Sequence, residues 1–249
     1  MLGASGRMGQ AVLDAAATME GVKVTAALVG AASVSLNKSS HGLTYGSDAA
    51  AALIGADVLL DFSLPGSTAQ ALDACLKAGK PLVTGVTGMD EALKARLTEA
   101  AKRIPVLAAP NMSLGVALLS RMAEQAARVL GPDFDIEISE AHHRHKKDAP
   151  SGTALRLAEV MSEARGKAPV DRKVDRQGLR QPGSIGFSVV RAGDIVGEHT
   201  VLFAGAGERL ELSHRAQSRS TFAHGALSAC RWTAGRQPGL YSLADTFET

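Results

Sequence analysis

Short apolar segments alternate with amphipathic segments through the first half of the chain. Apolar runs of strand length occupy residues 22–28, 57–62, 81–84 and 106–109. Apolar positions recur every three or four residues, the spacing of one helix face, in the segments 7–19, 66–78 and 90–102. Alternating strands and helices predict a parallel sheet with helices on both faces.

The pattern changes after Asn111. A long amphipathic helix is expected over residues 115–129, ended by a Gly-Pro pair. Strand-like segments then follow in close succession, with one helix among them at residues 153–164. These strand-like segments are residues 135–141, 184–191, 199–203 and 209–214. Such an order predicts a mixed or antiparallel sheet, and hence a second domain of α+β type. Residues 222–235 return to a helical pattern, and the polar residues 167–182 are expected to form an exposed loop.

The composition restricts the class of protein. Of the 249 residues, 45% are hydrophobic and 21% charged, which is typical of a globular protein. A net charge of +2 is too small to indicate a nucleic-acid binder. Cys75 and Cys230 lie in apolar, helix-like segments and are expected to be buried free thiols. Because no leader pattern and no apolar stretch of about 18 residues is found, we expect a cytoplasmic protein with no membrane partner.

A glycine-rich turn, GASGRMG, occupies residues 3–9. Glycines allow the backbone to turn sharply and to approach a pyrophosphate, while the helix that follows points its first amides at the phosphates. A strand–helix connection without a ligand has the same spacing, but the strand–helix alternation favours a dinucleotide. Only Met1 and Leu2 precede the turn, whereas a strand normally spans about five residues. Three explanations are open: the start site of the sequence is misassigned, the chain is truncated, or the first strand is unusually short.

Two further turns follow predicted strands. They are Gly85-Val86-Thr87-Gly88 and Ala109-Pro110-Asn111-Met112. Ligands of open α/β sheets bind at the carboxyl ends of the strands, so these turns are candidates to line the nicotinamide half of a site, although ordinary connections have the same form. The second strand ends at Val29-Gly30, with neither an acid for a ribose nor an Arg for a 2′-phosphate. We therefore expect only modest discrimination between NADH and NADPH.

The basic segment HHRHKK, residues 142–147, stands between a predicted strand and a predicted helix. Concentrated positive charge favours an anionic partner. Ser151 suits the N-cap of the following helix, and free amides at a helix N-terminus bind a carboxylate or phosphate. A His transfers protons near neutral pH, and a Lys holds an anionic substrate and donates a proton. The segment thus indicates acid catalysis on a small polyanion.

Three other interpretations of this segment are open. A metal site is disfavoured because no Cys or distant His/Glu pair completes the ligand set. A nucleic-acid patch is disfavoured because no aromatic residues are interleaved with the charges. A solvated loop is disfavoured by the adjoining anion site.

The longer segment EAHHRHKKDAPSGTAL, beginning at Glu140, closely resembles the signature of the dihydrodipicolinate reductase family of the diaminopimelate and lysine pathway. The resemblance extends over nearly the whole chain, through GASGRMG at Gly3, LLDFSLP at Leu59, GVTG at Gly85, APNMSLGV at Ala109 and VRAGDIVGEHTV at Val190. It implies a Rossmann-like dinucleotide-binding domain, residues 1–112 with 223–249, and an α+β domain with a mixed sheet, residues 113–222. The second domain is implied to bind substrate and to build a homotetramer.

The resemblance also implies the chemistry, which is NADPH- or NADH-dependent reduction of 4-hydroxy-tetrahydrodipicolinate, a small dicarboxylate. By position, His142 and Lys146 resemble the proton-transfer groups of the family, and no metal is implied. The residues that resemble substrate-carboxylate contacts are His143, Gly152 and Thr153. The residues that resemble cofactor contacts are Gly3, Ala4, Ser5, Gly6, Arg7, Met8, Gly85, Val86, Thr87, Ala109, Pro110, Asn111 and Met112.

Two other functions fit the same features. One is a related nicotinamide-dependent dehydrogenase acting on another small acid, and the other is a cofactor-binding regulator without turnover.

Overall fold

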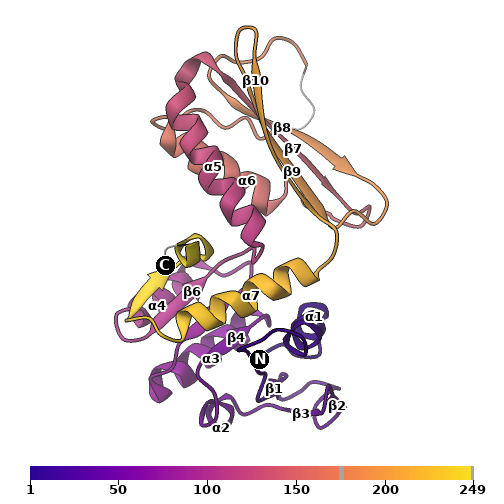
Figure 1. Ribbon diagram of the computed structural model, residues 1–249, viewed down its shortest axis with the longest axis vertical. Helices are drawn as coiled ribbons and strands as arrows, with labels where there is room; N and C mark the ends of the chain where they lie inside the picture. Colours follow the sequence, from indigo (N-terminus) through magenta and orange to yellow (C-terminus); the bar gives the residue numbers. More distant parts are fainter. Residues whose placement is uncertain (174–176, 248–249) are drawn as a thin grey trace. The chain divides into compact units, whose positions relative to one another are not determined.

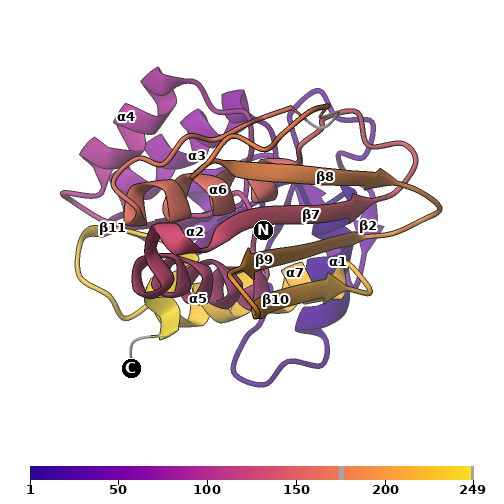
Figure 2. The same ribbon diagram turned by 90° about the horizontal axis from the view of Figure 1, so that it is seen from above.

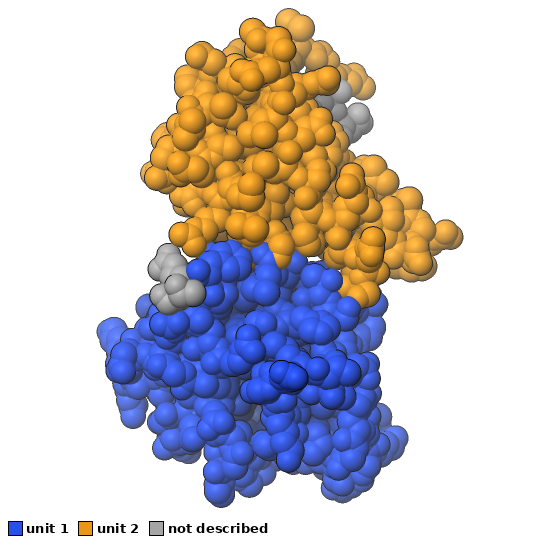
Figure 3. Space-filling view, in the orientation of Figure 1, with its two compact units in different colours: residues 1–114, 219–249 blue, residues 115–218 orange. Residues whose placement is uncertain are grey.

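The computed structural model describes residues 1–173 and 177–247. The chain forms two compact units, coloured separately in Figure 3. The first unit contains Met1–Leu114 and Arg219–Thr249, and the second contains Gly115–Ser218. The first unit is therefore discontinuous in sequence, because the whole second unit is inserted between its two parts.

A parallel sheet forms the centre of the first unit. Its strands are β1 (Ala27–Leu28), β3 (Leu43–Gly46), β4 (Leu59–Asp61), β5 (Leu82–Thr84), β6 (Pro105–Ala108) and β11 (Gly239–Tyr241). β3 pairs with β1, and β4, β5, β6 and β11 pair in succession, all in parallel. Leu2 joins the two groups through parallel bridges to Leu28 and Asp61. The short β2 (Ser39–Ser40) adds an antiparallel edge to β3.

Helices cover both faces of this sheet. One set is α2 (Ala49–Leu53), α3 (Pro65–Ala78) and α4 (Glu91–Ala100), whose apolar residues share a core with the strands. The other set is α1 (Arg7–Ala16) and α7 (Ser220–Thr233), which pack against one another. α7 contacts β4, β5 and β6, so the returning C-terminal segment completes the unit.

The expected strand over residues 22–28 is wrong over most of its length. Only Ala27 and Leu28 form a β-ladder. On the side of β1 that faces the centre of the sheet, the single residue Leu2 pairs with it. The amino group of Met1 donates to the carbonyl of Ala26 at 2.8 Å, and no further inner neighbour pairs with residues 22–25 among those described. A cavity of about 220 Å³ lies there, lined by residues 22–26, residues 55–60 and Met1 among others. It lies away from the carboxyl ends of the strands.

The second unit contains a mixed four-stranded sheet, as expected. Its strands are β7 (Asp135–His142), β8 (Ile185–Arg191), β9 (Gly197–Ala204) and β10 (Arg209–Ala216). Figure 2 shows them side by side in the order β10-β9-β7-β8. β9 is antiparallel to both β7 and β10, whereas β7 and β8 are parallel. The parallel pair requires a crossover connection, which contains α6 (Gly152–Ala164).

α6 and the long helix α5 (Leu114–Leu130) cover one face of this sheet (Figure 1). Alternate residues of each strand supply the apolar face, and the largest buried ones are Ile136, Ile138, Ile185, Phe187 and Phe203. They pack against Leu157 and Met161 of α6. Two 3-10 turns, Gly131–Asp133 and Leu243–Phe247, complete the elements.

Part of the expected loop at residues 167–182, namely residues 174–176, lies outside the described residues. The rest is mostly exposed, as expected. Arg180 is an exception, because it donates to the Ile136 carbonyl at 2.9 Å and pairs with Glu137. This side chain therefore anchors the end of the loop to β7.

An aromatic cluster lies at the end of α7. The Trp232 and Tyr241 rings meet edge to face with centroids 5.1 Å apart, and the Arg236 guanidinium lies 4.1 Å from the centre of the indole ring. The contact joins α7 to β11 in the first unit.

Gly225 allows α7 to approach the chain that leaves β6. A Cβ at this position would lie 1.8 Å from the Met112 carbonyl oxygen. We predict that Gly225→Ala destabilises the first unit by about 1–3 kcal/mol, since overpacking outweighs the better helix propensity of Ala. Urea unfolding followed by Trp232 fluorescence measures the change. In the control, Gly235→Ala, the new methyl group meets nothing within 4 Å, and equal midpoints for the two variants would contradict the prediction.

Candidate active site

The predicted cofactor turns meet at one edge of the parallel sheet. Gly3 follows the bridge residue Leu2, Gly85 follows β5, and Ala109 follows β6. Because these strands are parallel, the turns after them lie at the same carboxyl edge. The amides of Gly3 and Ala4 both donate to the Leu28 carbonyl at 3.0 Å, which fixes the turn against β1.

The glycine turn is tight because two Cβ atoms are missing. Gly3 has φ +81°, and a Cβ on it would lie 2.5 Å from the Phe62 carbonyl oxygen. A Cβ on Gly9 would lie 2.3 Å from the Gly3 carbonyl oxygen. α1 begins at Arg7, and its N-cap residue, Gly6, provides no side-chain cap. The first amides of α1 therefore have no partner within the helix, and this cradle fits the pyrophosphate of a dinucleotide.

The other predicted cofactor residues differ in exposure. Ser5, Gly6, Arg7 and Thr87 are exposed, whereas Ala4, Val86, Ala109 and Met112 are buried. Gly85 makes room for a neighbour, because a Cβ there would lie 2.2 Å from the Phe62 ring. At the end of β1, Val29 is buried and Gly30 is exposed. The buried members thus expose little side-chain surface at this edge of the sheet.

In the second unit, the basic segment connects β7 to α6. β7 ends at His142, and Ser151 is the N-cap of α6, as predicted, with its Oγ accepting from the Ala154 amide at 3.2 Å. The five residues predicted to handle substrate thus lie in one connection or at its ends. Their side chains are half-buried, except that Gly152 is exposed.

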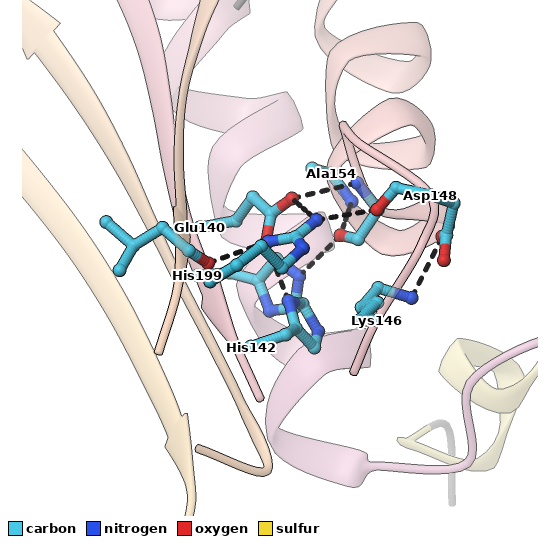
Figure 4. A network of polar contacts seen from close by, with 9 residues as sticks. Glu140, His142, Lys146, Asp148, Ala154 and His199 are labelled. Carbon is cyan, nitrogen blue, oxygen red and sulfur yellow. Dashed lines mark hydrogen bonds and ion pairs between the residues drawn. The ribbon is translucent and has the colours of Figure 1, made fainter. Parts of the chain in front are cut away.

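Glu140 is the centre of the polar network (Figure 4). Glu140 is only 2% exposed, although its side chain is a carboxylate. Arg191 donates to both oxygens, at 2.7 and 2.8 Å, and the Ser151 amide donates at 3.0 Å. Burial raises the pKa of this carboxyl, but hydrogen bonds from His142, Arg191 and Ser151 outweigh burial and lower the pKa to about 2. Glu140 is therefore ionised at neutral pH.

The ionised carboxylate determines the proton position on His142. His142 Nδ1 lies 2.6 Å from Glu140 Oε2. Because a carboxylate only accepts, Nδ1 must donate, which leaves Nε2 to exchange a proton with a ligand. Gly197 lies beside the ring, since a Cβ there would be 3.2 Å from Nε2.

His199 closes the network from β9. Its ring lies edge to face with the His142 ring, with centroids 5.2 Å apart, and its Nε2 is 3.1 Å from Ser151 Oγ. Burial, with a smaller effect of the His142 charge, lowers the pKa of His199 to about 4. His199 is therefore neutral at pH 7 and adds no charge beside His142.

Lys146 lies in the connection, with its Nζ 2.9 Å from Asp148 Oδ2. Its backbone amide donates to the His143 carbonyl at 3.0 Å, and the His143 ring lies 6.3 Å from the ring of His145. The hydrogen bond from Lys146 lowers the pKa of Asp148. This ion pair draws the ammonium toward Asp148, three residues before the N-cap residue of α6.

Two further features of the described residues bear on the site. They contain no group of three His, Cys, Asp or Glu side chains arranged to hold a metal ion. In the same part of the chain, no helix has the length and apolar character needed to cross a membrane.

Glu140, Arg191 and His199 were not among the predicted site residues. The strand pattern carries a signal for Glu140 and His199. Glu140 and His142 share a face of β7 with the buried Ile136 and Ile138. A carboxylate on an apolar strand face requires partners. His199 likewise shares the buried face of β9 with Val201 and Phe203.

Comparisons with known proteins agree with this architecture. Residues 1–112 match the family model described as Dihydrodipicolinate reductase, N-terminus, and residues 115–247 match the C-terminus model. The 4-hydroxy-tetrahydrodipicolinate reductase of Thiobacillus denitrificans is 51% identical, covering 98% of this chain and 95% of the relative. That of Alkalilimnicola ehrlichii is 49% identical, covering 98% and 96%.

A solved structure titled dipicolinate bound dihydrodipicolinate reductase, from a Paenisporosarcina species, has a TM-score of 0.81 at 24% identity. It covers 100% of this chain and 97% of that chain, which confirms the expected fold. An amine dehydrogenase from Mycobacterium smegmatis has a TM-score of 0.62 at 12% identity, covering 95% and 92%. The resemblance inferred from the basic segment is confirmed by the family models and the curated relatives. This chain belongs to the dihydrodipicolinate reductase family.

Proposed function

We propose that this chain catalyses the NADH- or NADPH-dependent reduction of 4-hydroxy-tetrahydrodipicolinate to tetrahydrodipicolinate, in the cytoplasm. The observation that carries the proposal is the pairing of His142 with the N-terminus of α6. Glu140 accepts from both the imidazole and the Ser151 amide, so a proton-transfer group and an anion site lie next to one another. The curated relatives that bear the name of this reductase support the substrate.

The cofactor would be held by the three turns at the edge of the parallel sheet. The residues that would hold it are Gly3, Ala4, Ser5, Gly6, Arg7, Met8, Gly85, Val86, Thr87, Ala109, Pro110, Asn111 and Met112. The nicotinamide, when bound, supplies the hydride. The amides at the start of α1 and the Arg7 guanidinium stabilise the pyrophosphate charge.

Substrate binding would use the positive end of α6. Gly152 and Thr153 are the first residues of the helix, and its first turn contains no acid. Their amides, together with His143, would hold a substrate carboxylate. His142 Nε2 and Lys146 Nζ would then transfer protons, because each is a nitrogen that gains and loses a proton while the substrate charge changes.

The first test is turnover. Purified protein is mixed with enzymatically generated 4-hydroxy-tetrahydrodipicolinate, and nicotinamide absorbance is followed with each cofactor. We expect turnover with this substrate and none with a panel of keto acids and amino acids. A preference for another acid would establish a different dehydrogenase. Cofactor binding without any turnover would establish a regulator and overturn the proposal.

The second test concerns the proton-transfer groups. We predict that His142→Gln combined with Lys146→Gln lowers kcat by at least about 100-fold, the usual size of general acid–base catalysis. The cofactor Kd should stay within about 2-fold, since neither residue belongs to the dinucleotide unit, and fluorescence titration measures it. Arg156→Gln, an exposed change on α6, is the control. Near-normal kcat in the double variant would contradict these roles.

We also propose that the chain forms a homotetramer through the sheet of the second unit. The face opposite α5 and α6 carries alternate residues of each strand, including the exposed Val190 and the half-buried Leu202. Apolar residues on an open sheet face favour burial against another copy.

Light scattering after gel filtration is expected to give four times the chain mass of 25.7 kDa. Combining Val190→Asp with Leu202→Asp should lower the mass, because the new charges would be buried. Val129→Asp, at an exposed position of α5, should leave it unchanged. A monomer mass for the unaltered protein would exclude the tetramer.

A further inference from the structure

Arg191 contacts the supports of both proposed proton-transfer groups. Its guanidinium donates to the two Glu140 oxygens at 2.7 and 2.8 Å, and to the Asp148 carbonyl at 2.7 Å. Glu140 accepts from the His142 imidazole, and the Asp148 carboxylate pairs with Lys146. One side chain on β8 thereby joins the end of β7 to the connection that carries Lys146.

The geometry requires a guanidinium in this place. The two parallel hydrogen bonds match the planar fork of Arg, and a further nitrogen–oxygen contact of 2.8 Å joins Arg191 to its neighbour's carbonyl at Val190. A Lys ammonium has no such fork. The Arg191 side chain is 18% exposed and that of Glu140 is 0% exposed, so the pair is shielded from solvent.

The pair also sets the charge that faces His142. Glu140 on β7 is an anion beside the imidazole, and Arg191 on β8 neutralises it. His199 on β9 is neutral at pH 7, and besides His142 and Glu140 the charges that act on His199 are those of His214 on β10 and Lys146. Removing one member of the pair would leave the other as an uncompensated charge.

We propose that Glu140 and Arg191 are positioning residues, which hold the His142 imidazole with Nδ1 as a donor and hold the Lys146 ammonium in register with it. The inference rests on the proposed function, because it assigns a role to residues that serve His142 and Lys146. It adds that the two groups are coupled through a single guanidinium.

Opposite charge changes should shift the His142 titration in opposite directions. Glu140→Gln removes the anion and disfavours the imidazolium, so the midpoint of the His142 titration moves to lower pH. Arg191→Met removes the cation and leaves the anion, so the midpoint moves to higher pH. Arg191→Lys keeps the charge but loses the fork, so the midpoint stays within a few tenths of a pH unit of the unaltered protein.

The experiment measures titration and turnover on the same full-length variants. Imidazole ¹⁵N NMR gives the tautomer and the midpoint for His142, assigned by its loss in His142→Gln. Turnover assays give kcat, expected to fall by about 10- to 100-fold in all three single variants, as for other residues that orient a functional side chain. The KM for the nicotinamide cofactor is expected to stay within about 2-fold. Arg156→Met is the control for the loss of a cation.

A single variant that leaves one buried ion unpaired could fail to fold. The double variant Glu140→Gln with Arg191→Met removes both charges and leaves no buried ion unpaired. Its midpoint should lie between those of the single variants. Circular dichroism checks that each protein is folded.

Midpoints that move in the same direction, or unchanged kcat in folded Arg191→Lys, would overturn the inference. An unaltered protein without reductase turnover would refute the proposed function instead. The NMR arm still tests the positioning in that case, because it needs no substrate.

Discussion

The carboxylate of Glu140 organises the second unit. A charge on the apolar face of β7 is costly unless it is fully hydrogen-bonded, and Glu140 receives bonds from Arg191, His142 and the Ser151 amide. Those three donors come from β8, from the end of β7 and from the N-cap of α6. The cost of burying one charge thus fixes where the crossover helix begins and which nitrogen of His142 is available.

The candidate sites of the two units are built in different ways. In the first unit, backbone geometry determines the shape of the site. Gly3 and Gly9 let the chain pack where a Cβ would clash with a carbonyl oxygen. In the second, side chains determine the geometry, because Arg191 donates to the Asp148 carbonyl and His199 bonds the Ser151 hydroxyl that caps α6. A dinucleotide pyrophosphate needs amides and little else, whereas a proton-transfer site needs titratable groups held at fixed distances.

Periodicity and turn chemistry predicted most of the elements, the mixed sheet and the connection that carries His142 and Lys146. The strand at residues 22–28 failed because a ladder depends on its neighbour, and a local pattern does not contain that neighbour. The short β2, β3 and β11 were missed because two to four residues carry no period. Arg191 and His199 were missed because their partners are about 50 residues away in sequence, at Glu140 and Ser151, and only the register of β7 with β8 and β9 brings them together.

The aromatic cluster at the end of α7 has a consequence for spectroscopy. Trp232 is the single tryptophan of the chain, and both tyrosines, Tyr45 and Tyr241, also belong to the first unit. Intrinsic fluorescence and near-ultraviolet absorbance above the phenylalanine bands therefore report on the dinucleotide unit and not on the second unit. If the second unit unfolds separately, these optical signals will miss its transition, whereas backbone circular dichroism will record both. A transition that appears in circular dichroism but not in fluorescence would show that the two units unfold separately.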